Sequence, residues 1–117
     1  MSYLLLIVEP VGQRAQRTEE EGRAAYAAMQ RYGESLQARG LLAAAQSLAN
    51  LDEGARVRVR NGRPSVMDGP FAEAKEMVGG FFLLNCETRE EALAVAAECP
   101  AAAWCTVEVR RLAPCYE

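Results

Sequence analysis

Apolar residues cluster along this chain in short runs whose spacing is typical of β-strands. Residues 3–8 and 81–84 are continuously apolar, which indicates strands that are buried on both faces. Residues 41–48 form another apolar stretch, which we interpret as a strand despite its alanines. Residues 56–60 and 106–110 alternate strictly between valine and a polar side chain, as strands do when one face meets a core.

Turn signals place a hairpin in the middle of the chain. Asn61-Gly62 separates residues 56–60 from residues 63–67, and this dipeptide is the strongest short signal for a tight hairpin turn. After the hairpin comes the loop that begins at Asp68. We predict one helical turn over residues 71–77 before the next strand starts.

A long amphipathic helix is predicted between the first two strands. The hydroxyl of Thr18 can accept from the amide of Glu21 while the Glu21 side chain reaches back, which is a capping box. The helix should run to about residue 39, because Gly40 suits the left-handed position that ends a helix. Its apolar stripe has spacings of four, three and four and consists of Ala25, Met29, Tyr32 and Leu36.

A second helix is predicted after the strand that ends near residue 84. Thr88 and Glu91 form another capping box, and Pro100 terminates the helix. The order is therefore strand, helix, strand and hairpin, strand, helix, strand. Two long helices cannot cover both faces of such a sheet. The predicted fold class is α+β, a ferredoxin-like split βαβ sheet with both helices on one face, in a single domain over residues 1–117.

The sheet face without helices has a consequence for assembly. Residues 3–8 and 81–84 are apolar on both faces, so this second face would expose an apolar patch too large for a comfortable monomer. We predict a two-fold homodimer in which the sheets of two copies pack face to face. The alternative is that the hairpin and the long loops cover the patch.

Composition narrows the classes of function. The net charge is −3 and there is no basic tract, which argues against a nucleic-acid partner. The apolar run over residues 3–8 is too short to span a bilayer and lacks the features of a signal peptide, so we expect a cytoplasmic protein without a membrane partner.

The side chains available for catalysis are also restricted. The chain has no histidine, which removes the usual general base near neutral pH and every nucleophile paired with histidine. Its four cysteines form no Cys-x-x-Cys pair, so we expect neither a metal site nor a cofactor.

The most informative segment runs Asp68-Gly69-Pro70-Phe71-Ala72-Glu73-Ala74-Lys75-Glu76. It is preceded by Val57-Arg58-Val59-Arg60-Asn61-Gly62 and followed by Gly79-Gly80-Phe81-Phe82, while the chain opens on Tyr3-Leu4-Leu5-Leu6-Ile7. In this order the segments resemble the YCII-related proteins of the DGPF type, over nearly the whole chain.

The resemblance implies a ferredoxin-like, dimeric α/β barrel. It also implies that the wider relatives include enzymes that act on small molecules. For these enzymes a histidine and an aspartate are the proposed acid–base pair. Some relatives are encoded near, or fused to, sigma factors, which makes a sigma factor a candidate partner. Relatives commonly carry a histidine-glycine pair before the last strand. Here the positions are Trp104-Cys105, so a mechanism that uses the histidine would lack its imidazole.

Three residues in and after the central loop are candidates for a site. Asp68 is the candidate catalytic residue, as a general base or as an anchor for a cationic or hydroxylated substrate. Alternatively, Asp68 caps the turn by accepting backbone N–H bonds. Phe71 is either a ring that stacks on a ligand or a hydrophobic plug. Lys75 either faces a cleft roofed by a partner subunit or lies on a solvated surface.

A second candidate group lies on the alternating strands. Arg58, Glu108 and Arg110 should share one sheet face, because period-two alternation separates them from the valines expected to face the helices, Val57, Val59, Val107 and Val109. One alternative is an anion pocket, with Arg58 and Arg110 on a carboxylate or phosphate. The other is a ladder of cross-strand ion pairs that fixes the dimer register.

Three functions stay open at this point. The first is a protein that binds an unknown small molecule, with a regulatory role. The second is a cofactor-free enzyme that acts on a small polar or aromatic metabolite, with Asp68 as its acid or base. The third is an interaction module linked to a sigma factor.

Overall fold

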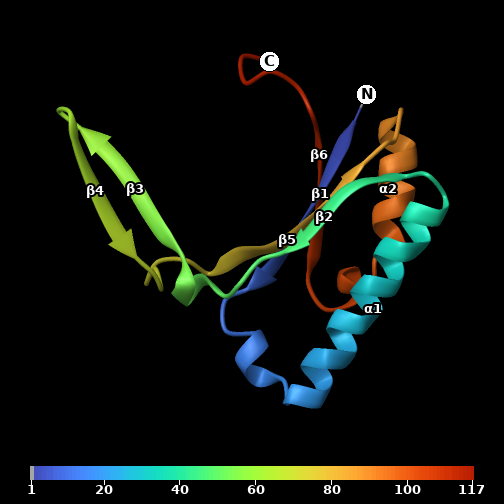
Figure 1. Cartoon of the computed structure of the whole chain (residues 1–117), viewed down its shortest axis with the longest axis horizontal. Helices are drawn as coiled ribbons and strands as arrows, with labels where there is room; N and C mark the ends of the chain where they lie inside the picture. The colour runs from blue at the N-terminus through green and yellow to red at the C-terminus, as the bar shows by residue number, and fades with distance from the viewer. Residues whose placement is uncertain (1) are drawn as a thin grey trace.

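A four-stranded antiparallel sheet forms the centre of the molecule (Figure 1). The structure is a computed structural model that describes residues 2–117. The strand order is β2-β5-β1-β6, and each neighbouring pair is antiparallel. The bounds are β1 (Tyr3–Pro10), β2 (Leu42–Ser47), β5 (Glu76–Leu84) and β6 (Thr106–Arg111). This α+β, ferredoxin-like arrangement is the predicted one.

Two helices lie on the same side of the sheet, as predicted (Figure 1). Helix α1 spans Glu19–Ala38, and Thr18 opens it with the complete capping box to Glu21. Gly40 follows with φ +72°, a left-handed conformation that glycine adopts without steric cost. Helix α2 spans Arg89–Ala97, and the Thr88 hydroxyl accepts from the Glu91 amide.

The hydrophobic core fills the space between the helices and the sheet. Leu5 on β1, Leu36 on α1 and Leu84 on β5 are completely buried. The Tyr32 ring packs edge-on against Phe82 with ring centroids 5.2 Å apart. The alternate residues of the strands point to the opposite side, which we call the open face. Its apolar residues are half-buried and comprise Leu4, Leu6, Val8, Phe81 and Leu83.

The central hairpin does not join this sheet. Strands β3 (Ala55–Arg60) and β4 (Arg63–Asp68) pair only with each other and project away from the sheet, and we call them the arm (Figure 1). The predicted turn is confirmed, with φ 53° at Asn61 and +73° at Gly62. The expectation that Val57 and Val59 face the helices is wrong, because they are 65% and 58% exposed. Alternation identifies a strand but not the sheet that it joins.

The Asp68 loop holds the base of the arm. The Gly69 amide donates to the Gly54 carbonyl at 2.7 Å, and a Cβ on Gly69 would lie 2.2 Å from the Leu51 carbonyl oxygen, so only glycine fits. Phe71 is 5% exposed, and the Arg56 guanidinium stacks over its ring at 3.7 Å from the centroid. The predicted helical turn over residues 71–77 is wrong. A non-helical turn takes its place, and β5 already begins at Glu76.

Three short 3-10 turns complete the described chain: η1 (Arg14–Gln16), η2 (Leu51–Glu53) and η3 (Pro100–Ala103). None of the helices in residues 2–117 is long and apolar enough to cross a membrane.

Candidate functional site: a cleft between α1 and the sheet

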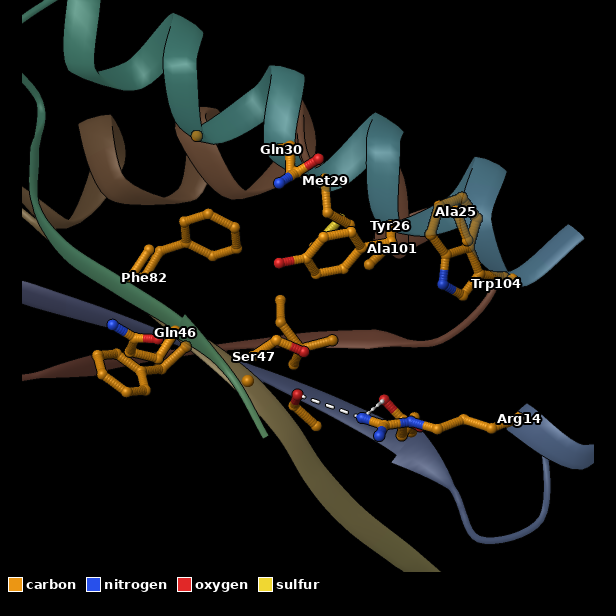
Figure 2. A pocket seen from close by; sticks show the side chains of 18 of the residues that line it. Arg14, Ala25, Tyr26, Met29, Gln30, Gln46, Ser47, Phe82, Ala101 and Trp104 are labelled. Carbon is orange, nitrogen blue, oxygen red and sulfur yellow. Dashed lines mark hydrogen bonds and ion pairs between the residues drawn. The ribbon is translucent and has the colours of Figure 1, made fainter. Parts of the chain in front are cut away.

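A cleft of about 550 Å³ opens between the N-terminal half of α1 and the sheet (Figure 2). Its walls come from elements that are distant in sequence: the end of β1, η1, α1, the end of β2, the middle of β5 and the segment around η3. The volume is within the usual range for sites that hold a small organic molecule.

One side of the cleft is apolar and aromatic. Met29 and Ala25 on α1 face it, and Phe82 and Trp104 lie at its two ends (Figure 2). The Tyr26 ring lies between them and is 54% exposed, so it forms part of the mouth. The stripe predicted for α1 therefore divides. Tyr32 and Leu36 enter the core, whereas Ala25 and Met29 line the cleft.

The opposite side carries a partly buried ion pair. Arg14 Nε donates to Glu9 Oε1 at 2.7 Å, and Glu9 is only 8% exposed. The same guanidinium donates to the carbonyls of Leu48, at 2.9 Å, and Gly79, at 3.3 Å. Arg14 therefore links the end of β1, the residue after β2 and the interior of β5. A charge this deep is tolerated because it is paired and hydrogen-bonded.

A β-bulge makes room for the ion pair. The register of β1 against β5 shifts between Ile7, opposite Gly80, and Val8, opposite Val78, which leaves Gly79 as the extra residue. A Cβ on Gly79 would lie 1.9 Å from Glu9 Oε2. Glycine at this position is therefore a condition for the Glu9–Arg14 pair.

Polar contacts fix Trp104 at the mouth of the cleft. Gln13 Nε2 donates to the Trp104 carbonyl at 2.6 Å, and the Arg17 guanidinium lies 5.7 Å from the centre of the indole ring. Arg17 also donates to Gln13 Oε1 at 3.4 Å. The tryptophan thus forms a wall of the cleft, at the position that the resemblance matches to a histidine of relatives.

Burial affects two titratable groups near the cleft. Burial raises the pKa of the Cys105 thiol next to Trp104, so the thiol stays protonated at neutral pH and is a poor nucleophile. Burial likewise raises the pKa of Tyr32 behind Phe82. Among residues 2–117, no three Cys, Asp or Glu side chains lie close enough to hold a metal ion.

Asp68 lies outside the cleft. It is the exposed last residue of β4, and its side chain makes no hydrogen bond to any of the described residues. Within one chain it therefore neither joins the cleft nor caps the turn, and its catalytic role stays a prediction. Phe71 is buried at the base of the arm, in keeping with the plug alternative, and Lys75 is exposed.

The other predicted ligand-binding residues do not converge within one chain. Arg58 lies on the arm, whereas Arg110 and Glu108 lie on β6 in the main sheet. Arg110 pairs with Glu108 at 3.3 Å, and both side chains are exposed. The expectation that Arg58 and Arg110 share one sheet face is therefore wrong for a single chain, because β3 does not belong to the main sheet. A ligand-binding role for these residues stays a prediction.

Sequence reasoning missed the residues that form the cleft floor. Glu9 directly follows the apolar run over residues 3–8, and a carboxylate that ends a buried strand is a signal in the sequence that could have identified it. Arg14 gave no signal of its own, because its contact with Glu9 depends on the bulge at Gly79.

The fold is similar to that of a solved enzyme. This is 5-chloro-2-hydroxyhydroquinone dehydrochlorinase from Burkholderia phenoliruptrix AC1100, solved in complex with 2,5-dihydroxybenzoquinone. The TM-score is 0.54 at 18% sequence identity, and the likeness covers 97% of this chain and 94% of the other. At this identity the likeness concerns the fold alone.

Sequence comparison identifies relatives and a family. An uncharacterised protein of Rhizobium meliloti (strain 1021) is 43% identical over 54 residues, which are 46% of this chain. The match spans less than half, 44%, of that protein's length. The model of the YCII-related domain matches residues 1–115. The chain therefore belongs to the YCII-related family.

Proposed function

We propose that this protein binds a small planar molecule with polar substituents in the cleft between α1 and the sheet. The observation that carries the proposal is one cavity with aromatic side chains on one side and the partly buried Glu9–Arg14 pair on the other. Pockets for small molecules typically combine apolar walls with a few fixed polar groups that orient the ligand.

The apolar wall suits a flat ring. Phe82, Tyr26 and Trp104 offer aromatic surfaces around the cavity, and Met29 adds a polarisable thioether beside them (Figure 2). Phe82 is held by its edge-on contact with Tyr32, so this wall is already formed before a ligand enters. A preformed wall lowers the cost of ordering side chains on binding.

Polar side chains are available to orient such a ring. Gln30, Gln46 and Ser47 line the cleft, and their side chains make no hydrogen bond to any described residue. They can exchange water for hydroxyl or carbonyl groups of a ligand. Arg17 at the mouth adds a positive charge that favours an anionic substituent.

The structural neighbour supports the choice of ligand class. That enzyme was solved with 2,5-dihydroxybenzoquinone, a flat six-membered ring with oxygen substituents. The combination matches the aromatic and polar sides of the present cleft. We therefore select this compound as a probe, together with 2,5-dihydroxybenzoate, which adds a carboxylate for Arg17.

Isothermal titration calorimetry tests the proposal with two matched variants. Ala25→Phe fills the cavity from α1, whereas Ala24→Phe adds the same ring at an exposed neighbouring position that does not line it. We expect binding of at least one probe with a dissociation constant below about 1 mM, a modest efficiency for a ligand of about ten heavy atoms. Ala25→Phe should weaken binding at least about tenfold, and Ala24→Phe should leave it unchanged.

The same titration separates the cleft from the Asp68 loop. Asp68→Asn should bind the probe as the wild type does, because Asp68 lies outside the cleft. Loss of binding in Asp68→Asn with retention in Ala25→Phe would contradict the cleft as the site and favour the enzyme hypothesis centred on Asp68. If neither probe gives a measurable heat of binding, the result would contradict the proposed ligand class.

A further inference from the structure

We propose that Glu9 determines which ligand the cleft selects, by accepting a hydrogen bond from a protonated hydroxyl group on the bound ring. The preferred ligand is then a phenol rather than the corresponding ether or halide. This inference rests on the proposed function, because it names the chemistry of the ligand in the same cleft.

The Glu9 carboxylate lies at the wall of the cavity with little access to water. It lines the cleft, and its side chain is 10% exposed, whereas the side chain of Arg14 is 32% exposed. A charged group that has lost most of its water must find its hydrogen bonds within the site. A ligand that displaces the remaining water therefore has to replace its hydrogen bonds to the carboxylate.

Arg14 leaves part of the accepting capacity of Glu9 unused. Its Nε donates to Oε1 at 2.7 Å and its Nη2 to Oε2 at 3.3 Å. A carboxylate has about four lone-pair positions. Among the described residues, no other side chain or backbone group donates to this carboxylate. A ligand can therefore donate to the remaining positions.

Arg14 itself has little left to offer a ligand. Besides Glu9, its guanidinium donates to the carbonyls of Leu48 and Gly79. These contacts occupy most of the five N–H groups that a guanidinium carries. This side of the cleft thus presents mainly an acceptor, and the ligand has to supply the hydrogen.

The ion pair also limits the charge of the group that Glu9 accepts. A cationic group would meet the Arg14 guanidinium beside the carboxylate, and an anionic group would meet the carboxylate itself. A neutral hydroxyl avoids both repulsions. Phenols fit this requirement because they keep their proton at neutral pH, with an ordinary pKa of about 10.

The backbone preserves the position of this carboxylate. Gly79 is the extra residue of the bulge, and a Cβ there would lie 1.9 Å from Glu9 Oε2. Stability alone is a weak reason for such an arrangement, because desolvation of two paired charges offsets much of their attraction. The place of Glu9 at the cavity wall instead favours a role in binding.

Isothermal titration calorimetry at pH 7 tests the inference with three ligands that differ at one ring position. They are 2,5-dihydroxybenzoate, 5-methoxy-2-hydroxybenzoate and 5-fluoro-2-hydroxybenzoate. All three keep the carboxylate that suits Arg17, but only the first can donate a hydrogen bond from position 5. It should bind the wild type at least about tenfold more tightly than either analogue, because a charge-assisted hydrogen bond is lost and an acceptor is left unpaired. The fluoro analogue adds no bulk, so its weaker binding would not be steric.

Two matched variants assign the selectivity to Glu9. Glu9→Gln can keep its amide oxygen on Arg14 Nε and then presents an N–H group, which donates to a hydroxyl or a methoxy oxygen alike. The ratio of the methoxy to the dihydroxy dissociation constant should fall at least about fivefold. Glu98→Gln removes the charge of a similar pair with Arg39 outside the cleft and should keep the wild-type ratio. A purely structural role of Glu9 would weaken all three ligands equally and leave the ratio unchanged.

The outcomes separate this inference from the proposed function. Equal binding of the three benzoates by the wild type would overturn the inference and leave the cleft as a binding site. Binding of 2,5-dihydroxybenzoquinone alone would do the same, because its hydroxyl groups are ionised at neutral pH. An unchanged ratio in Glu9→Gln would assign the selectivity to another group and overturn the inference. If no probe binds, both proposals fail. If Glu9→Gln does not fold, the three wild-type titrations still decide.

Discussion

The body of the molecule, meaning the four-stranded sheet with α1 and α2, and the arm are built from similar sequence patterns but differ completely in burial. In the body, Leu5, Leu36 and Leu84 are fully enclosed by neighbours. In the arm, no residue of either strand is buried. The body has a core of its own, whereas the arm depends on its turn, its base and whatever packs on it. A strand pattern in the sequence therefore does not reveal where the stability of that strand comes from.

The largest expected effect separates the two regions directly. Leu36→Ala should lower the free energy of unfolding by about 3 kcal/mol, because it removes a completely buried side chain and leaves a cavity. Val59→Ala in the arm should cost less than about 0.5 kcal/mol in the monomer. Urea unfolding at low protein concentration measures both. Equal losses would mean that the arm is part of the monomer's cooperative core.

A smaller effect is expected at the junction between the two regions. Phe71→Ala removes the ring that seals the base of the arm beneath Arg56. We expect a local loss of about 2 kcal/mol, which would accelerate amide exchange over residues 55–68 about 30-fold. Amides around Leu5 in the body should be protected as before. Met67→Ala, at an exposed position on the arm, is the control and should leave both regions unchanged.

The smallest expected effect lies inside the body and depends on pH. The Tyr32 hydroxyl donates to the Val95 carbonyl at 2.7 Å, so Tyr32→Phe should cost about 1 kcal/mol at pH 8. Burial raises the pKa of Tyr32 above the value near 10 of an unfolded chain. The raised pKa means that the folded state favours the protonated hydroxyl, so its stabilisation is complete below pH 10 and is lost as the pH rises above it.

Urea unfolding at pH 8 and pH 11 checks this difference. The wild type should lose more stability than Tyr32→Phe between the two values. Burial also raises the pKa of the Cys86 and Cys99 thiols, but both proteins share that contribution. Parallel losses in the two proteins would assign the alkaline sensitivity to the thiols rather than to Tyr32.

Local signals predicted individual elements well in both the body and the arm. The capping box at Thr18, the left-handed Gly40 and the turn at Asn61-Gly62 each depend on a few neighbouring residues, and the structure contains all three. The two-helix, one-face arrangement followed from the order of the elements. Each of these inferences required only short-range chemistry or a count of the faces to be covered.

The arm and the cleft were beyond such reasoning for different reasons. Valines at positions 57 and 59 indicate a half-buried strand, but the covering surface need not belong to the same chain. The cleft floor depends on Glu9, Arg14 and Gly79, which meet only through a bulge between two strands. Asp68 was a candidate because of its sequence motif. In the structure, the neighbouring Gly69 and Phe71 hold the base of the arm in place.

Trp104 gives the molecule a built-in optical reporter. It is the single tryptophan of the chain, and its indole forms a wall of the cleft beneath Arg17. Selective excitation of this ring therefore reports on the cleft, while the arm contributes no indole emission of its own. A molecule that enters the cavity displaces water from the indole and should move its emission to shorter wavelength without any attached label. Occupancy of the cleft can thus be followed through the emission of one ring.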